Sequence, residues 1–207
     1  MKKFFVVLLA VMIVTSITFA KNPTAPMARA IEDVKNAIVG ESTASAKYAA
    51  YAKKAKEEGY TKVSLLFEAA SKAEAIHAGN HKAALEQLGD KSPVVDPKFA
   101  VKSTKENLED AIKGESYEIA TMYPEFMKDA NEAKANIALL SFNYAYQTEQ
   151  KHKAMYTNAL KALNEKNEKT LPSQYQVCPT CGNTYEGTAP ARCGISMTPR
   201  ERFLTIM

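Results

Sequence analysis

Two short motifs in the chain carry residues that could bind metal ions. Each has a glutamate followed three positions later by a histidine, at Glu74 and His77 and again at Glu149 and His152. On an α-helix, residues three apart lie on the same face, so each motif would present a carboxylate and an imidazole side by side. Carboxylate oxygens and imidazole nitrogens both bind divalent transition metals such as iron. The motifs therefore predict a metal site.

The two motifs belong to an internal repeat. The segment AIVGES at residues 37–42 recurs as AIKGES at 111–116, and the Glu-x-x-His motif recurs in the same order, at an offset only one position longer. One Glu-x-x-His could arise by chance, but two motifs that recur in order at almost the same offset indicate a duplicated unit. The repeat adds Glu41 and Glu115 to the candidate ligands.

The segments that carry these residues have helical periodicity. Apolar residues recur in each at spacings of three and four, which is typical of a helix with one buried face. In the third segment this spacing places Met122 and Phe126 on the buried face. Gly89 stands where a helix commonly ends, and Ser103 with Glu106 forms a capping-box motif at a helix start. The sequence predicts an all-α fold of two antiparallel helix pairs joined by a crossover, with helices over residues 26–58, 62–88, 104–130 and 132–164.

Each predicted buried face also contains an acid, namely Glu41, Glu74, Glu115 or Glu149. Burial of one uncompensated carboxylate costs roughly several kcal/mol, and a domain has only about 5–15 kcal/mol of net stability. Residues 30–191 contain no arginine, and the lysines fall mainly outside the buried faces. Bound cations are therefore the economical counter-charge. The alternative is that some of these glutamates reach water at the edge of a face and that the histidines are ordinary core or surface residues.

A third histidine, His81, lies one turn beyond His77 on the same predicted face. It has no histidine counterpart in the second repeat. We expect His81 to be structural.

The arrangement of the ligands resembles that of a known protein class. One glutamate on each of two helices, with Glu-x-x-His on each of the other two, is the pattern of ferritin-like di-iron proteins. More narrowly, GES at 40–42, GESYE at 114–118 running into MYPEF at 122–126, and a C-terminal Cys-x-x-Cys resemble the rubrerythrins over residues 27–207. The resemblance implies a ferritin-like four-helix bundle at 26–164 that holds two irons, a linker at 165–175 and a rubredoxin-like domain at 176–207.

The resemblance also implies a role for each residue of the centre. Glu74 and Glu149 would bridge the two irons, Glu41 and Glu115 would be terminal ligands, and His152 would bind one iron. Glu118 and His77 would alternate as ligands to the other iron when the redox state changes. Tyr48 and Tyr123 match tyrosines that surround the ligands in the family, and the alternative for both is a plain core aromatic residue.

The C-terminal segment departs from the rubredoxin pattern at one position. Such a ribbon binds one iron through two Cys-x-x-Cys loops, but the second loop of this chain has Ser196 in place of the fourth cysteine. A unit of about 32 residues normally needs a metal or a crosslink to fold. We expect one iron, or zinc, bound by Cys178, Cys181, Cys193 and Ser196. The alternative is a degenerate ribbon in which Cys178 and Cys181 form a disulfide and Cys193 stays free.

The N-terminus has the features of an export signal. Lys2 and Lys3 precede an apolar run that ends near a small-residue cleavage site at 18–20, which predicts a signal peptide over residues 1–20 and a periplasmic location. An uncleaved membrane anchor is the alternative. The 27 Lys and Arg against 23 Asp and Glu give a net charge of only +4, which does not indicate a nucleic-acid partner.

By the resemblance, the chain is expected to be an oxidoreductase. It would be a non-haem di-iron peroxidase that reduces hydrogen peroxide to water in oxidative-stress defence. An unknown electron donor would act through the C-terminal iron, which in a head-to-tail homodimer reaches the centre of the partner subunit. Ser196 favours an alternative, a ferroxidase or iron-binding protein that oxidises Fe(II) with peroxide or oxygen and has a non-functional ribbon. A further alternative is a bundle that metal merely stabilises.

Overall fold

The computed structural model describes residues 23–207, and the predicted signal peptide at 1–20 lies outside the described residues. None of the helices within 23–207 is long and apolar enough to cross a membrane.

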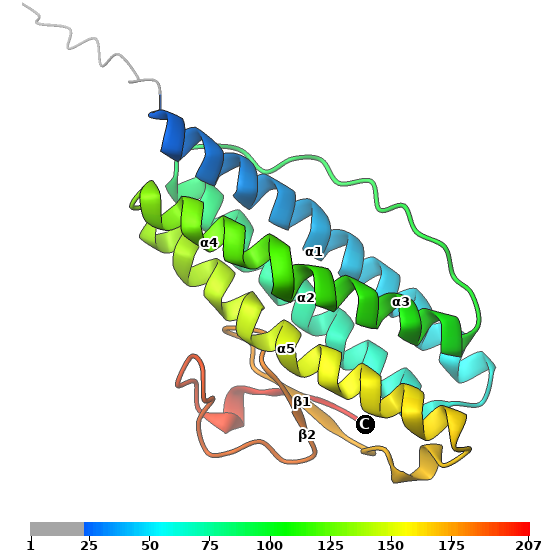
Figure 1. Ribbon diagram of the computed structural model, residues 1–207. Helices are drawn as coiled ribbons and strands as arrows, with labels where there is room; N and C mark the ends of the chain where they lie inside the picture. The colour runs from blue at the N-terminus through cyan, green and yellow to red at the C-terminus, as the bar shows by residue number, and fades with distance from the viewer. Residues whose placement is uncertain (1–22) are drawn as a thin grey trace, which may run out of the picture.

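The helices form an elongated bundle of two antiparallel pairs (Figure 1). The first pair is α1 (Ala25–Glu57) and α2 (Thr61–Gln87), and the second consists of a segmented helix packed against α5 (Asn136–Asn164). The segmented helix comprises α3 (Thr104–Tyr117), η1 (Glu118–Met122) and α4 (Tyr123–Glu132). Between the pairs, the chain from Leu88 to Ser103 runs back along the outside of the bundle without regular structure (Figure 1). The predicted helical fold and crossover are confirmed.

The start of the second pair is capped as the sequence predicts. The Ser103 hydroxyl accepts a hydrogen bond from the backbone N–H of Glu106, and the Glu106 carboxylate accepts one from the backbone N–H of Ser103. The two residues thus satisfy backbone groups that would otherwise be unpaired at the first turn of α3.

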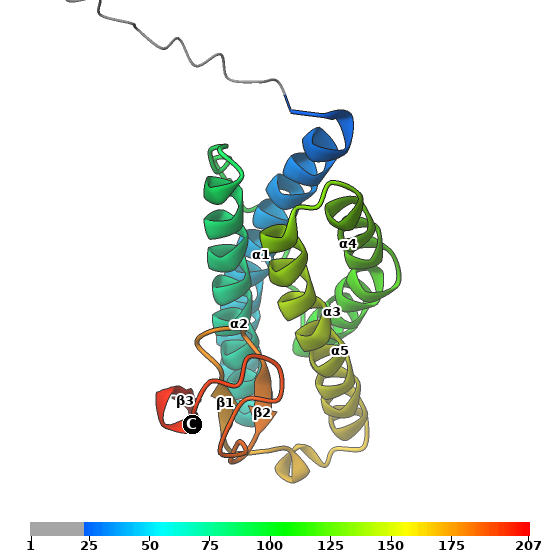
Figure 2. The same cartoon turned by 90° about the vertical axis from the view of Figure 1, so that its left-hand side faces the viewer.

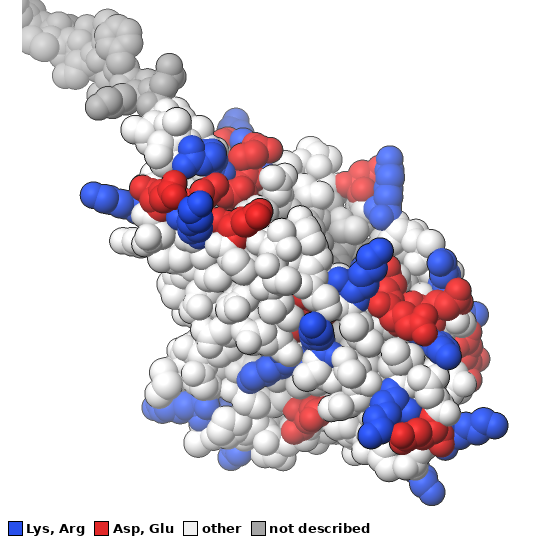
Figure 3. All heavy atoms as spheres, viewed as in Figure 1, with Lys and Arg blue, Asp and Glu red and all other residues white. Residues whose placement is uncertain are grey.

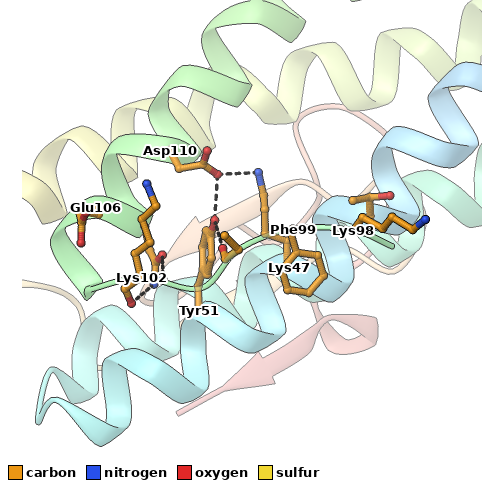
Figure 4. Close-up of a pocket in the computed structure, with 10 residues that line it drawn as sticks. Lys47, Tyr51, Lys98, Phe99, Lys102, Glu106 and Asp110 are labelled. Carbon is orange, nitrogen blue, oxygen red and sulfur yellow. Dashed lines mark hydrogen bonds and ion pairs between the residues drawn. The ribbon is translucent and has the colours of Figure 1, made fainter. Parts of the chain in front are cut away.

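The crossover is held against the bundle by side chains of α1. The hydroxyl of Tyr51 lies 3.2 Å from the carbonyl oxygen of Ala100 and 3.0 Å from the carboxylate of Asp110, which also pairs with Lys47 at 2.9 Å. These residues line a surface pocket between α1, the crossover and α3 (Figure 4). None of the predicted metal ligands is among the ten residues that line it.

Segment η1 is a single turn of π-helix, which the periodicity of the sequence did not predict. A π-turn carries one more residue than an α-turn, so the helix face shifts by one position after it. Tyr123 is fully buried, whereas Met122 and Phe126 are only half-buried. Beyond Glu118 the predicted face therefore lacked its most buried residue, Tyr123, while Met122 and Phe126 pack against the apolar cluster and are only half-buried.

The core has two apolar clusters, one toward each end of the bundle. One includes Phe67, Leu108 and Tyr156, and the other includes Ile38 and Phe142. On every long helix the acidic residue of the predicted buried face falls between positions that belong to the two clusters. A charged layer is thus enclosed by apolar layers on both sides.

The C-terminal segment forms a small antiparallel sheet beside the bundle. Its strands are β1 (Tyr175–Val177), β2 (Thr184–Glu186) and β3 (Leu204–Ile206), in the order β2-β1-β3. The sheet lies against α2, and β2 also contacts α5 (Figure 2). Tyr175, Val177 and Ile206 pack into the apolar cluster of the bundle. The linker carries the short helix η2 (Glu168–Thr170), and η3 (Arg200–Arg202) precedes β3.

Charged side chains on the face seen in Figure 3 form mixed groups of both signs, separated by wide uncharged areas. One ionic group joins α1 to α4, where Arg29 lies 3.4 Å from Asp129 and 2.9 Å from Glu132.

Candidate metal centre

Six predicted ligands converge in the middle of the bundle. They come from four helices, and each residue is at most 1% exposed: Glu41 from α1, Glu74 and His77 from α2, Glu115 from α3, and Glu149 and His152 from α5. Helical spacing places them on the inner faces, as the sequence predicted.

The six residues form two overlapping groups. Within each, one ligand atom per residue lies within 4.8 Å of all the others. Glu74 and Glu149 belong to both groups. The first group is completed by Glu41 and His77, and the second by Glu115 and His152.

The two shared glutamates face both histidines. Glu74 has one oxygen 2.9 Å from Nδ1 of His77 and the other 3.1 Å from Nδ1 of His152. Glu149 repeats this arrangement, with its oxygens at 2.9 Å and 2.8 Å from the same two atoms. Each carboxylate therefore spans the two groups, which is the placement expected of a bridging ligand.

Glu118 differs from the other six. It lies at the start of η1, is partly exposed, and belongs to neither group of ligand atoms in the described part of the chain. Burial of its carboxyl group first, and then the charge of Glu41, raise the pKa of Glu118 well above its ordinary value. Its carboxyl group thus lies near the centre without completing either half, and its exchange with His77 stays a prediction.

Both histidines are oriented by hydrogen bonds to the C-terminal module. Nε2 of His77 lies 3.1 Å from the carbonyl oxygen of Cys181, and Nε2 of His152 lies 3.0 Å from the hydroxyl of Thr184. A carbonyl oxygen only accepts, and the Thr184 hydroxyl donates to the carbonyl of Gly182. Each Nε2 is therefore the donor, and in the neutral imidazole the lone pair lies on Nδ1, which faces the carboxylates.

Close approach of the module depends on Gly182, which has φ +76°. A Cβ atom at this position would overlap the imidazole of His77. Only a residue without a side chain lets the backbone reach the histidine.

Several buried atoms of the centre have no hydrogen-bond partner among residues 23–207. They are Oε2 of Glu41, Oε1 of Glu74, Oε2 of Glu115, both carboxylate oxygens of Glu149 and Nδ1 of His152. Buried polar atoms are rarely left without a partner, because each costs free energy. All of these atoms point into one small space and are hard or borderline ligands. The donor set therefore fits a pair of transition-metal cations.

The pKa values show how strongly the centre demands positive charge. Burial raises the pKa of Glu41 to about 8. Burial also opposes ionisation of Glu74, but His152 and His77 outweigh it and lower the pKa of Glu74 to about 2. Burial would lower the pKa of His152, yet the negative charges of Glu74 and Glu149 raise it to about 10. Protons thus supply the positive charge that divalent cations would replace.

Each half of the centre has one tyrosine hydroxyl on its outer glutamate. Tyr48 of α1 donates a 2.7 Å hydrogen bond to Oε1 of Glu115, and Tyr123 of α4 donates to Oε1 of Glu41. Both rings also pack in the apolar clusters. Each tyrosine therefore both donates a hydrogen bond to a candidate ligand and packs as a core aromatic residue, the two roles that the sequence left open.

The positions of the two tyrosines show where the extra residue of the second repeat lies. The interval from Tyr48 to Tyr123 is one position longer than the interval from Glu41 to Glu115. The extra residue falls in the stretch that contains η1. The change of offset between the two repeats was the sequence signal for the π-helix. No local sequence pattern predicted that Thr184 or Gly182 would lie beside the centre.

The three cysteines form a second cluster within the C-terminal module. Cys178, Cys181 and Cys193 are fully buried and form no disulfide. Their three sulfur atoms lie within 4.8 Å of one another. Sγ of Cys181 and Sγ of Cys193 are 3.4 Å apart. The hydrogen bond from Cys181 lowers the pKa of Cys178 to about 4 despite burial. A thiolate is thus favoured at Cys178, as metal binding requires, whereas the same hydrogen bond raises the pKa of Cys181.

Ser196 occupies the fourth corner of this cluster. Its hydroxyl oxygen lies 3.2 Å from Sγ of Cys178 and 2.8 Å from the hydroxyl of Thr198. Thr198 donates to Thr180, so the single proton of Ser196 goes either to Thr198 or to Sγ of Cys178. When it goes to Thr198, the lone pairs of the Ser196 oxygen are left for a cation held by the sulfur atoms.

Comparison with known proteins agrees with this geometry. The family model described as rubrerythrin matches residues 32–160. The chain belongs to the rubrerythrin family. It is 34% identical over 175 residues to nigerythrin of Nitratidesulfovibrio vulgaris, with 84% of each chain covered. It is also 31% identical over 171 residues to rubrerythrin-2 of Clostridium acetobutylicum, covering 82% of this chain and 92% of the relative.

Solved structures support the same assignment. A fully reduced, all-ferrous nigerythrin superposes with a TM-score of 0.75 at 32% identity, over 93% of this chain and 91% of that one. A Desulfovibrio desulfuricans bacterioferritin, described by its di-iron site, shares the fold with a TM-score of 0.64 at 19% identity, over 82% of this chain and 95% of that one. The predicted resemblance to rubrerythrins and the ferritin-like fold are therefore confirmed.

Proposed function

We propose that the chain is a non-haem di-iron peroxidase that reduces hydrogen peroxide to water. Membership of the rubrerythrin family supports a di-iron oxidoreductase of oxidative-stress defence in general. The observation that carries the finer proposal is the pair of overlapping ligand groups that share Glu74 and Glu149. Two adjacent metal ions suit a two-electron reaction of a small substrate.

The distances support an assignment of the residues that would hold the irons, and the exchange of Glu118 rests on the family resemblance. Glu74 and Glu149 would bridge them, Glu41 with His77 would complete one half, and Glu115 with His152 the other. Glu118 would enter the first half in exchange for His77. When bound, the two irons supply the two electrons by which hydrogen peroxide, with two protons, becomes two water molecules.

The protein itself orients and insulates the reacting space. The apolar clusters on both sides exclude bulk water, which strengthens every electrostatic interaction within the centre. Tyr48 and Tyr123 hold the outer glutamates by one oxygen each and leave the other oxygen free. The C-terminal module holds both imidazoles with Nδ1 facing inward.

Electrons would enter through the C-terminal module of the same chain. The Cys181 carbonyl that accepts from His77 belongs to a residue of the cysteine cluster, so a single hydrogen bond joins the two candidate metal sites. The contact within one chain supports this route. The alternative that we propose is a head-to-tail homodimer, in which the C-terminal module of one subunit reaches the centre of its partner.

The ferroxidase alternative rests on Ser196. A hydroxyl or alkoxide is a harder ligand than a thiolate, so Ser196 would weaken an iron or zinc site and shift its potential. A ribbon that cannot relay electrons would leave Fe(II) as the reductant of the bundle.

Substitution of Ser196 distinguishes the peroxidase proposal from the ferroxidase alternative. We expect iron-loaded Ser196→Cys to consume peroxide about tenfold faster than the unaltered chain with an electron donor that reduces the ribbon. Ser173→Cys, in the exposed linker, controls for an added thiol. If neither chain turns over unless Fe(II) is the reductant, the ferroxidase alternative replaces the peroxidase.

We also propose export to the periplasm, supported by the charged and apolar N-terminal segment. N-terminal sequencing of the protein from a periplasmic fraction should start at Lys21. A chain that keeps Met1 and sediments with membranes would support the anchor instead.

A further inference from the structure

His81 is a buried histidine that the proposed metal centre does not use. It is 0% exposed, and its ring packs 5.4 Å from the ring of Phe142, measured between centroids. Both of its nitrogens nevertheless have partners. Nε2 lies 3.2 Å from the hydroxyl of Tyr123, and Nδ1 lies 2.7 Å from the hydroxyl of Ser141.

These contacts continue to the metal centre. The hydroxyl of Tyr123 donates to Oε1 of Glu41, so three hydrogen bonds connect Ser141, His81, Tyr123 and Glu41 in series. Oε2 of Glu41 has no hydrogen-bond partner within the described residues and lies 3.7 Å from Nδ1 of His77, on the side of the candidate cation.

The direction of each hydrogen bond follows from the chemistry of the last acceptor. A metal-bound carboxylate only accepts, so Tyr123 gives its single proton to Glu41. The Tyr123 oxygen must then accept from Nε2–H of His81. A neutral imidazole protonated on Nε2 has a bare Nδ1, which can only accept, so Ser141 is the donor. Burial, followed by the charge of His77, lowers the pKa of His81 to about 3, which agrees with a neutral ring.

The internal repeat makes His81 a point of difference between the two halves. The offset that relates His77 to His152 relates His81 to Tyr156. Tyr156 packs edge-on against Tyr48 at 5.5 Å between centroids, and its hydroxyl has no hydrogen-bond partner in the part of the chain that the structure describes. The Glu115 half therefore has a tyrosine, Tyr48, on its outer glutamate, but it lacks the further hydrogen bonds that continue from Tyr123 to His81 and Ser141 in the other half.

We infer that His81 is a positioning residue for the Glu41 half of the metal centre. As the Nε2–H tautomer it fixes the hydroxyl of Tyr123 on Oε1 of Glu41 and so presents Oε2 to the cation. The inference rests on the proposed di-metal centre and adds that the two halves are built unequally, with the more rigid outer glutamate beside His77.

The tautomer can be tested directly on the unaltered chain. The sequence has only three histidines, so nitrogen-15 spectra of histidine-labelled, zinc-loaded protein contain three imidazoles, and zinc is diamagnetic. We expect the non-coordinating imidazole to carry its proton on Nε2 and to keep Nδ1 bare. A proton on Nδ1, alone or in addition, would overturn the inference.

Cobalt(II) binding tests the consequence for the metal. Its visible absorption reports oxygen and nitrogen ligands in the bundle, separately from thiolate bands of the ribbon. We expect His81→Leu to weaken one of the two bundle sites about 10- to 100-fold, as other loss of ligand support does. His81→Gln should recover part of the loss, because its amide can still donate to Tyr123. Tyr156→Phe, the matched change in the other repeat, should leave both sites unchanged.

The outcomes separate this inference from the proposed function. Failure of the unaltered chain to bind two cobalt ions in the bundle would overturn the di-metal centre itself. Normal binding of both ions by His81→Leu would overturn only the role of His81. If His81→Leu does not fold, Ser141→Ala removes the outer donor with a smaller change. Weaker binding of one cobalt ion by that variant would support the chain of hydrogen bonds, and unchanged affinity of both bundle sites would count against it.

Discussion

At the scale of single residues, the centre is defined by carboxylates that face two histidines at once. Glu149 places one oxygen near each imidazole, and neither oxygen has a hydrogen-bond partner in the region that the structure describes. A side chain in this position has no apparent structural use, because an apolar residue of similar volume would fill the space without a desolvation cost. Its presence is accounted for by a bound cation on each side.

Glu149→Ala should therefore remove a bridge and strip most of the iron. We expect metal analysis of the purified variant to give well below the two irons of the unaltered bundle, since loss of a ligand costs more than the roughly 10- to 100-fold lost with an outer partner. Glu165→Ala, an exposed acid just past the end of α5, is the control. Two irons retained in Glu149→Ala would contradict the bridging role.

Protonation of the centre predicts a pH dependence for the metal-free protein. The pKa of Glu41 is raised from 4.5 to about 8 and that of His152 from 6.5 to about 10. Groups with a raised pKa stabilise the fold below their unfolded pKa and lose this contribution as the pH rises through the folded value. The pKa of Glu74 is lowered from 4.5 to about 2, so its contribution to stability is lost only as the pH falls below about 4.5.

The metal-free chain should consequently become less stable between about pH 5 and pH 9. We expect the Tm of chelator-treated protein to fall by more than ~5 °C over this range. Metal binds the deprotonated ligands, so the stabilisation by zinc should grow over the same range. A Tm of the metal-free protein that is constant or rises with pH would show that the acids and histidines are not protonated together.

At the scale of elements, the third helix shows what periodicity can and cannot predict. Glu115 was placed correctly because α3 is regular up to Tyr117. Beyond it, the π-turn moves Tyr123 onto the inner face, where a regular helix would have placed Met122. Helical spacing assumes a constant number of residues per turn, so a single inserted residue is seen only by comparing the two repeats.

The capping box of α3 offers a test at this scale. Ser103→Ala should cost about 1 kcal/mol of unfolding free energy, because the N–H of Glu106 loses its acceptor. For a chain of this size the Tm should fall by about 2–4 °C. Ser92→Ala, in the exposed crossover, should have no measurable effect. An equal fall in both variants would indicate that the cap contributes nothing specific.

At the scale of the whole molecule, the joining of bundle and C-terminal module could not be predicted from sequence. The ligand set could, because metal ligands recur at helical spacing within each repeat. The contact of His77 with the Cys181 carbonyl instead joins residues 104 apart. It depends on the left-handed backbone of Gly182 and on how two separately patterned units pack, for which neither segment carries a local signal.

Gly182→Ala should separate the two units without removing the bundle ligands. The added methyl group would collide with His77 and strain the backbone. We expect the variant to keep its bundle iron, while peroxide reduction that depends on the ribbon falls about tenfold or more. Gly187→Ala, which also has positive φ but no neighbour near the added carbon, controls for strain alone. Equal loss in both variants would mean that the contact with His77 is not the electron route.

The duplicated architecture has an evolutionary consequence. Two identical helical hairpins paired about a twofold axis would have to carry the same residue at every equivalent position. Fusion into one chain removes that constraint, and the histidine at 81 opposite the tyrosine at 156 is a difference that a symmetric pair of identical hairpins could not carry. One iron could then specialise while its neighbour kept the original surroundings.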